Sequence, residues 1–328
     1  MTRPERLFSG IQPTGVVHVG NYLGAIRNWV RLLERYDCIY CIVDYHAMTM
    51  RYEAAAMPGR ILDLAAVLLA SGLTQDRCTL YVQSEVPEHA ELCWMLSTVA
   101  GLGELERMTQ FKDKSSQDRD NVNLGLLAYP VLQTADIILF KATAVPVGED
   151  QLQHLELARE IVRRFNRKFG PVFPEPQALT TPGARILGLD GQAKMSKSLN
   201  NFIGLVEPPE VIWEKLRPAV TDPQRVRRSD PGRPEVCNIY SLHRHFSDPP
   251  RIQFVERECR SAGIGCIDCK KLLAESMEAE LGPIRQRYQE WTENLERVRA
   301  ALRTGVERAA ELARQTMSEV RRAVGLRE

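Results

Sequence analysis

The sequence predicts an α/β protein built in two parts. Residues 1–205 alternate short apolar strands with amphipathic helices, a pattern typical of a doubly wound parallel sheet with crossover helices. Beyond about residue 206 the strand signals stop, and Pro-rich joints at Glu207-Pro208-Pro209 and Asp248-Pro249-Pro250 separate helical segments. A chain of 328 residues fits this division into one large α/β domain, 1–205, and a smaller all-helical domain, 206–328.

The elements follow from hydrophobic periodicity. Leu23, Ile26, Val30 and Leu33 recur at helical spacing, whereas Cys38–Asp44 is a continuous apolar run, as expected of a strand buried on both faces. We expect, in chain order, a strand at 6–11, a helix at 19–36, a strand at 38–44, a helix at 61–70, a strand at 79–83, and a helical tail at 270–326 broken near Gly282-Pro283 and Gly305.

Composition narrows the class of protein. Hydrophobic residues make up 44% and charged residues 26% of the chain, which is ordinary for a globular protein. No apolar run approaches the roughly 18 residues that cross a membrane, so we expect a cytoplasmic protein with reduced thiols. The net charge of +1 does not by itself indicate a nucleic-acid partner.

Two distant segments have the chemistry of a phosphate site. The first, Phe8–Asn21, reads as a strand, a Gly/Pro turn and a helix start, where free N–H groups favour anions. The second, Gly191–Ser198, places Lys194 and Lys197 in a loop that could fold over a triphosphate, where their charge would act as pyrophosphate leaves. Alone, either segment would more readily be an ordinary turn or a solvated loop.

Together the two segments resemble the paired signatures of class I aminoacyl-tRNA synthetases. His18-Val-Gly-Asn21 is similar to the His-Ile-Gly-His motif with Asn in the last place, and Lys194-Met-Ser-Lys-Ser198 matches the Lys-Met-Ser-Lys-Ser motif unchanged. The resemblance implies in-line attack of an amino-acid carboxylate on the α-phosphate of ATP, with Mg²⁺. Catalysis would then consist of positioning and charge stabilisation, without a protein nucleophile.

Further segments resemble the tryptophanyl branch of that family, among them Gly103–Lys112 and Val147–Gln151. The indole N–H is a donor without an acceptor, so its pocket needs a buried acceptor. Asp136 is a lone acid in an otherwise apolar helix, and by resemblance it accepts that N–H. The alternative is an acid on the helix surface.

The resemblance also implies the remaining site residues. For tryptophan they are Phe8, Gln12, Tyr129, Gln133, Asp136, Val145 and Gln151; Gln133 departs from the family's commoner methionine. For ATP they are Gln12, Thr14, His18, Gly20, Asn21, Gly148, Asp150, Ile186, Lys194, Met195, Ser196 and Lys197, with Lys112 matching a mobile lysine that joins Lys194 and Lys197 in catalysis.

The sequence disfavours three other functions. A tyrosyl enzyme needs two polar partners for the phenol, including a tyrosine, and none stands near Phe8. A nucleotidyltransferase that makes a small-molecule adenylate would have no need of residues 206–328. A non-catalytic RNA-binding or redox-sensing relative would be expected to lose the Lys194–Ser198 motif, which is intact.

The eight cysteines divide into two groups. Cys38 and Cys41 point to opposite faces of a strand, so they are expected in the core, like Cys78 and Cys93. The second group is spaced Cys-x21-Cys-x6-Cys-x2-Cys and resembles a motif in some bacterial tryptophanyl synthetases that holds a [4Fe–4S] cluster; zinc or free thiols are the alternatives. Its members are Cys237, Cys259, Cys266 and Cys269.

The helical domain is expected to recognise the anticodon end of tRNA(Trp). Arg225, Arg227 and Arg228 lie in one short segment and are candidates for phosphate contacts, although a solvated basic turn is an equal alternative. Family resemblance further implies L-tryptophan as substrate and a homodimer.

Overall fold

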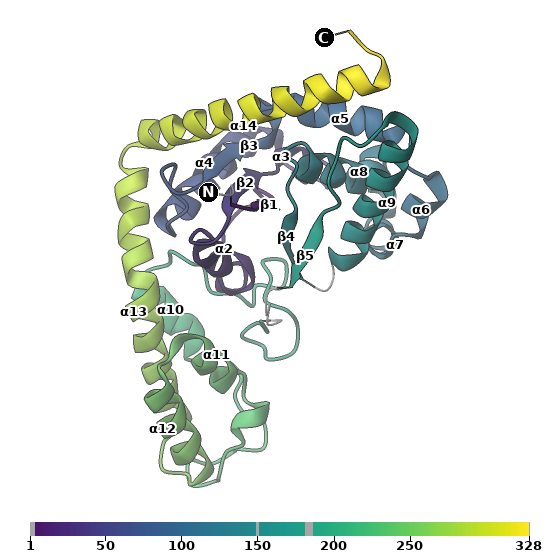
Figure 1. Ribbon diagram of the computed structural model, residues 1–328. Coiled ribbons are helices and arrows are strands. Elements are labelled where there is room, and N and C mark those ends of the chain that lie inside the picture. Colours follow the sequence, from purple (N-terminus) through teal and green to yellow (C-terminus); the bar gives the residue numbers. More distant parts are fainter. Residues whose placement is uncertain (1–3, 149–150, 181–185, 328) are drawn as a thin grey trace.

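The computed structural model describes residues 4–148, 151–180 and 186–327, without the side chains of Gln117 and Thr180. Over these residues the strands form a parallel five-stranded sheet in the order β3-β2-β1-β4-β5 (Figure 1). The strands are β1 Arg6–Ile11, β2 Asp37–Ile42, β3 Thr79–Val82, β4 Ala144–Val147 and β5 Gln177–Thr180. The predicted doubly wound sheet is confirmed.

The chain crosses from one half of the sheet to the other beside β1. Strands β1, β2 and β3 follow one another in one direction, and β4 then returns to the opposite side of β1. In such sheets, ligands bind where the order reverses, beyond the carboxyl ends of the strands. Gln12 follows β1 and Gly148 follows β4, so both predicted site residues lie at this position.

Strand β2 is buried on both faces, as its apolar run predicts. Cys38 packs in the hydrophobic cluster on one face and Cys41 in the cluster on the other, each about 1% exposed. The strand ends at Ile42, however, and Asp44 begins helix α3, Asp44–Ala47. The carboxylate of Asp44 accepts the backbone N–H of Tyr45 and of Ser84, which favours a helix start over an extended strand.

The first crossover is a continuous helical run with a π-turn inside it. It comprises α1 Val19–Asn21, the π-segment η1 Tyr22–Ile26 and α2 Arg27–Leu32. It therefore ends four residues before the predicted end at 36, and helix α4, Met57–Ala70, begins before the predicted 61 because Pro58 is favourable in a first helical turn. The helices of the other half are α5 Glu88–Ser97, α6 Leu102–Arg107, α7 Thr109–Gln117, α8 Leu124–Ile138 and α9 Leu152–Phe169.

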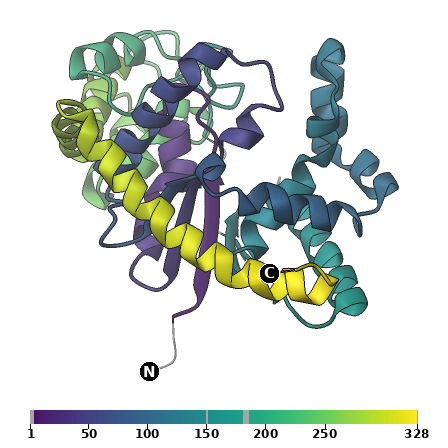
Figure 2. The ribbon, with the colours of Figure 1, turned by 90° about the horizontal axis from the view of Figure 1, so that it is seen from above.

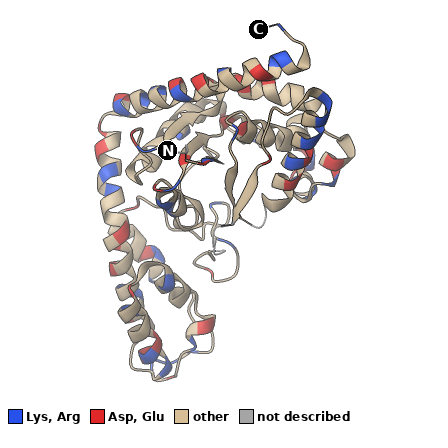
Figure 3. Cartoon of the chain, viewed as in Figure 1, with Lys and Arg blue, Asp and Glu red and all other residues tan. Residues whose placement is uncertain are grey.

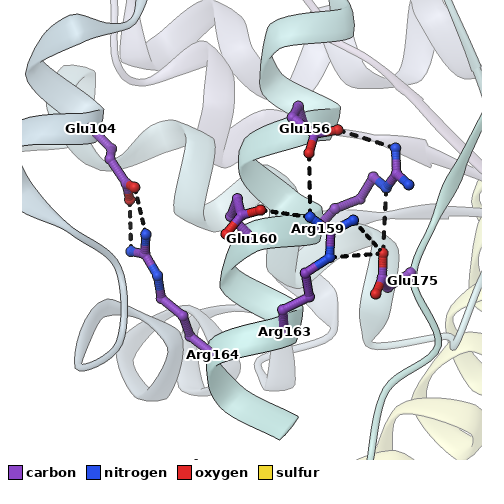
Figure 4. A network of polar contacts seen from close by, with 7 residues as sticks. All are labelled: Glu104, Glu156, Arg159, Glu160, Arg163, Arg164 and Glu175. Carbon is purple, nitrogen blue, oxygen red and sulfur yellow. Dashed lines mark hydrogen bonds and ion pairs between the residues drawn. The ribbon is translucent and has the colours of Figure 1, made fainter. Parts of the chain in front are cut away.

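Ion pairs cover the outer face of α9 (Figure 4). Arg163 contacts Glu160 at 2.6 Å and Glu175, before β5, at 2.8 Å. Arg164 forms a bidentate ion pair with Glu104 of α6, with N–O distances of 2.5 and 2.7 Å. Such a network holds the α6–α9 layer more effectively than isolated surface pairs do.

The residues described beyond 206 are helical, as predicted. The helices are α10 Pro209–Leu216, α11 Asn238–Phe246, α12 Pro249–Arg260, α13 Cys266–Thr292 and α14 Leu295–Val324. The predicted breaks at Gly282-Pro283 and Gly305 are wrong, because α13 and α14 run through them. The chain turns instead at Glu293-Asn294, where the Asn294 side chain accepts the backbone N–H of Glu296.

Helix α13 joins the helical part to the sheet domain. Glu280 accepts the hydroxyl of Tyr22 at 2.7 Å and pairs with Arg27, and Tyr288 donates to Asp63 of α4 at 2.5 Å. Charges of both signs are interspersed along α13 and α14 (Figure 3), and no helix among the described residues is long and apolar enough to cross a membrane.

Helix α14 crosses back over the sheet domain and packs on β3 (Figures 1 and 2). A Cβ at Gly305 would overlap the backbone carbonyl oxygen of Leu80. Gly305 is therefore a point of close helix–strand contact, which explains why a glycine stands inside an unbroken helix. Helix α14 thus packs on a strand that lies more than 200 residues earlier in the sequence.

Candidate active site

A cavity of about 350 Å³ opens beyond β1 and β4, at the lower end of the range of small-molecule sites. Its walls come from β1, the first crossover, α7, α8 and β4. Eight residues predicted from the sequence line it: Phe8, Gln12, Tyr129, Gln133, Asp136, Val145, Gly148 and Gln151. The structure therefore brings together the whole set predicted to bind tryptophan.

Asp136 is about 1% exposed and is surrounded by donors. His46 Nε2 lies 2.7 Å from Oδ2, and Gln83 Nε2 donates to Oδ1 at 2.7 Å. His89 Nδ1 lies 2.7 Å from the same Oδ1. Burial would raise the pKa of Asp136, but His46 and His89 lower it to about 2, so the group is a buried carboxylate.

Sequence reasoning did not find the residues that hold Asp136. His46 and Gln83 follow the carboxyl ends of β2 and β3, and His89 lies on α5. Their positions after predicted strands gave a weak signal for His46 and Gln83, whereas His89 has none, because its partner is 47 residues away in the sequence.

A second polar group lines the cavity around Tyr129, whose ring centroid lies 6.2 Å from that of His46. The hydroxyl of Tyr129 is 2.7 Å from His154 Nε2 and donates to Gln110 Oε1 at 3.1 Å. Gln133 donates to Gln151 at 3.5 Å, so the residue that departs from the family pattern is joined to another predicted tryptophan ligand. These groups provide further hydrogen-bonding atoms at the cavity.

The lysine at the cavity is Lys114, not the predicted Lys112. Lys114 Nζ lies 4.6 Å from the centre of the Tyr129 ring and lines the cavity, whereas Lys112 is exposed and does not. Both are on α7, and residues two apart on a helix point away from each other, so one of them at most faces the site. Burial lowers the pKa of Lys114.

The two phosphate-site segments lie side by side. Lys197 Nζ donates to the carbonyl oxygen of Thr14 at 2.8 Å, and Gly15 has a φ of 105°, a conformation that favours glycine. Backbone hydrogen bonds from Val19 to Ile203 and from Leu205 to Val17 join the segments, each shorter than 3.0 Å. The expected proximity of two motifs some 180 residues apart is therefore observed.

His18 caps the helix that follows the turn. Its ring accepts the backbone N–H of Asn21, while Asn21 Oδ1 accepts the backbone N–H of His18. Burial and then the charges of Lys197 and Lys194 lower the pKa of His18 to about 4, so its ring is neutral at pH 7. A Cβ at Gly20 would lie 3.0 Å from this ring and 3.3 Å from Cβ of Met195, which leaves no space there for a larger side chain.

The other predicted ATP residues lie around this junction. Met195 donates a backbone hydrogen bond to Ile186 at 2.9 Å, and both side chains are buried. Ser196 donates its backbone N–H to Asn201 at 2.8 Å, and Lys194 is exposed. Asp150 lies outside the described residues.

The four cysteines of the helical part come near one another. Arg225 Nη1 lies 3.8 Å from Sγ of both Cys259 and Cys266. Burial and then the thiols of Cys237, Cys259 and Cys266 raise the pKa of Cys269 to about 12. Among the described residues, however, no group of three or more His, Cys, Asp or Glu side chains is arranged to hold a metal ion.

The three arginines predicted to contact tRNA have different environments. Arg225 is partly buried and donates to the carbonyl oxygens of Ile264 and Arg228, at 2.7 and 3.1 Å. Arg227 and Arg228 are exposed, and Arg228 lies 3.8 Å from Asp268. Arg225 therefore belongs to the packing around the cysteines, and the other two face solvent.

Comparisons with known proteins agree with this geometry. The family model for class I tRNA synthetases (W and Y) matches residues 1–282. A tryptophan–tRNA ligase of Deinococcus radiodurans is 50% identical over 326 residues, covering 98% of each chain. One from Helicobacter pylori strain J99 is 43% identical over 327 residues, 98% of this chain and 99% of that one.

Among solved structures, the tryptophanyl-tRNA synthetase of Campylobacter jejuni complexed with ADP and tryptophan has a TM-score of 0.90. It is 34% identical in sequence, and the match covers 98% of this chain and 100% of that one.

Proposed function

The chain belongs to the class I tRNA synthetases of the tryptophan and tyrosine group, and we infer from its site that it is a tryptophan–tRNA ligase. It joins tryptophan to ATP, releasing pyrophosphate, and then transfers the tryptophanyl group from the adenylate to tRNA. The observation that carries the choice of amino acid is the buried, ionised Asp136 at a cavity whose walls include Phe8 and Val145. The relatives that match most of the chain have the same activity.

We propose that tryptophan lies with its indole against Phe8 and Val145, which are neighbours on β1 and β4, and its N–H on Asp136. A charged acceptor strengthens this hydrogen bond and disfavours side chains that lack a donor, since the carboxylate would then remain buried and short of one partner. Gln12, Tyr129, Gln133 and Gln151 supply polar atoms for the ammonium and carboxylate.

We propose that ATP binds as its Mg²⁺ complex at the junction of the two phosphate-site segments. The neutral ring of His18 can hydrogen-bond a phosphate or ribose oxygen without adding charge. Gly20, Asn21, Ile186 and Met195 surround the base and ribose, and Thr14, Gly148, Asp150 and Ser196 complete the set. This placement rests on the contacts between residues 14–21 and 194–205.

The chemistry of activation needs no protein nucleophile. The tryptophan carboxylate attacks the α-phosphorus, the bond to the bridging oxygen breaks, and pyrophosphate leaves with the charge. Lys194, Lys197 and Lys114 are the cations that we expect to stabilise this charge, with Lys114 in place of Lys112 because it lines the cavity.

We propose that the four cysteines hold a [4Fe–4S] cluster. Four soft thiolates are the usual donor set of such a cluster. Arg225 adds a positive charge beside two of the sulfurs, and burial raises the pKa of Cys237, an effect that the backbone N–H groups of Tyr240 and Ile239 partly offset. Zinc is the less favoured alternative, because zinc sites more often show two close Cys pairs and only Cys266 and Cys269 are close in the sequence here. The cluster would fix the loop between α12 and α13.

We further propose that the helical part binds the anticodon end of tRNA(Trp), with Arg227 and Arg228 on phosphates. The cytoplasmic homodimer expected from the family stays a prediction, which light scattering of the purified protein would test.

Amino-acid-dependent ATP–pyrophosphate exchange across all twenty amino acids tests the main conclusion. We expect exchange with tryptophan and little with tyrosine or phenylalanine. Preference for tyrosine would replace the assignment with that of the sister enzyme, and exchange without transfer to tRNA would indicate an adenylate-forming enzyme.

A further inference from the structure

We propose that His89, which lies outside the cavity, is a positioning residue that fixes Asp136 as an ionised acceptor with one site left for the indole. This rests on the proposed role of Asp136 in tryptophan recognition. His89 is 0% exposed and does not line the cavity, so it acts through Asp136 and not on the ligand.

The ring of His89 lies between a carboxylate and a hydroxyl. Its Nδ1 is 2.7 Å from Oδ1 of Asp136, and its Nε2 is 2.8 Å from the hydroxyl of Tyr81. The first contact is bent away from ideal hydrogen-bond geometry, so Nδ1 lacks a straight acceptor. We nevertheless assign the proton to Nδ1, because two bare lone pairs 2.7 Å apart in a buried site would repel each other.

This tautomer of His89 fits both of its contacts, with Asp136 and with Tyr81. With Nδ1 protonated, Nε2 is the acceptor, and the Tyr81 hydroxyl is the donor to it. The Tyr81 ring also stacks on the His89 ring, with centroids 5.8 Å apart and planes 16° apart. The hydroxyl of Tyr81 therefore selects both the tautomer and the orientation of His89, as a second shell commonly does.

The other donors around Asp136 are equally constrained. Gln83 accepts the backbone N–H of Tyr45 through Oε1, at 3.2 Å, so its amide nitrogen must face Asp136. His46 takes Oδ2. An ionised carboxylate has about four lone-pair sites, and these three donors leave one, which the cavity exposes to a ligand.

Three buried groups near Asp136 carry no charge at neutral pH, while the Asp44 carboxyl, which also accepts the Tyr45 N–H, and Lys114, which lines the cavity, face the same region. Burial raises the pKa of Cys41 on β2 and of Tyr81 on β3 well above their usual values, and raises that of Cys93 on α5 to about 11. Burial opposes the charge of Asp136, and His46 and His89 are what lower its pKa, while Gln83 adds a hydrogen bond. Removing His89 should therefore raise the pKa of Asp136.

The test is the KM for tryptophan in ATP–pyrophosphate exchange, measured from pH 5.5 to pH 8 in the full-length protein. His89→Phe keeps an aromatic ring against Tyr81 and Phe140 but removes both nitrogens. We expect the tryptophan KM to rise by about tenfold, as for loss of one hydrogen bond to a charged group, and to rise further as the pH falls. The KM for ATP should not change.

Two further variants separate positioning from packing. His89→Asn places an amide nitrogen where Nδ1 stood, and it should restore much of the tryptophan affinity and the flat pH profile. Tyr81→Phe removes the hydroxyl that contacts His89 Nε2, and it should raise the tryptophan KM less than His89→Phe does. His89→Phe alone leaves the buried Tyr81 hydroxyl without its His89 partner, which could prevent folding. The double variant Tyr81→Phe/His89→Phe removes that hydroxyl and can be tested in its place.

Asp136→Ala distinguishes the possible failures. If Asp136→Ala loses tryptophan affinity while His89→Phe keeps it unchanged across the pH range, the role of His89 is overturned and the indole assignment stands. If Asp136→Ala also keeps its tryptophan KM, the proposed recognition fails first, and the role of His89 fails with it.

Discussion

Replacing Gly305 by alanine should destabilise the protein, although alanine is the better helix former. The added Cβ would overlap the carbonyl oxygen of Leu80 and lie 2.6 Å from its carbonyl carbon. Overpacking of a close contact costs about 1–3 kcal/mol, and a rigid backbone obstacle favours the upper end of that range. The gain in helix propensity offsets about 1 kcal/mol, so the net loss is about 2 kcal/mol.

Thermal unfolding measures this loss. At about 2 °C per kcal/mol for a chain of this size, Gly305→Ala should lower the Tm by about 4 °C. Gly59→Ala is the matched control, because it is also inside a helix, α4, and has no atom within 4 Å of the added Cβ. It should stabilise the protein by about 0.5–1 kcal/mol. If Gly305→Ala melts at or above the wild-type temperature, the close packing of α14 on β3 is refuted.

Four other outcomes are expected. Asp136→Asn should weaken tryptophan binding by about 1.5–3 kcal/mol and leave ATP binding nearly unchanged, as measured by calorimetry; unchanged tryptophan affinity would exclude Asp136 as the indole partner. Adenylate formation, measured in the pre-steady state, should be slowed more than tryptophan binding is weakened by Lys194→Ala, Lys197→Ala and Lys114→Ala. The exposed Lys112 provides the control variant, Lys112→Ala. A loss confined to tryptophan affinity would contradict the phosphate assignment. Protein purified anaerobically should be brown and contain about four irons per chain. Cys266→Ser or Cys269→Ser should remove the iron and lower tRNA charging, but ATP–pyrophosphate exchange should remain. Stoichiometric zinc in place of iron would make the site a zinc site. The folded protein favours neutral His18, whose pKa falls from 6.5 to about 4, so its contribution to stability is complete above pH 6.5 and is lost as the pH falls toward 4. The Tm of wild type should therefore decline more steeply than that of His18→Gln over this interval, and parallel curves would contradict the burial of a neutral ring.

The parts of the fold that sequence predicted best are those set by local pattern. Most of the apolar run at 38–44 forms a doubly buried strand, which ends at Ile42, because its side chains meet a hydrophobic cluster on each face. The phosphate-site segments were recognisable because their chemistry is local to each: a turn with Gly15, a helix start at His18 and two lysines in a loop. Their proximity could then be inferred from the pairing of the two motifs.

The wrong helix break and the residues that sequence reasoning missed depend on contacts between distant residues. Gly305 reads as a helix break in sequence, but its lack of a side chain serves the approach of α14 to Leu80. Lys112 and Lys114 have the same local environment, and the orientation of α7 over Tyr129 decides between them. His89 meets Asp136 only through the packing of α5 on α8, which leaves no periodic signal in the sequence.

The packing of α14 on β3 also has a consequence during synthesis of the protein. Gly305 follows Leu80 by 225 residues, so at about 5–20 residues per second a ribosome needs roughly 11–45 s to supply the partner of β3. Until then the terminal strand of the sheet lacks its covering helix, and an uncovered strand is a template for pairing with other chains. Strand β3 is therefore open to pairing with other chains from its own synthesis until α14 emerges, and in this interval a chaperone would protect the nascent protein.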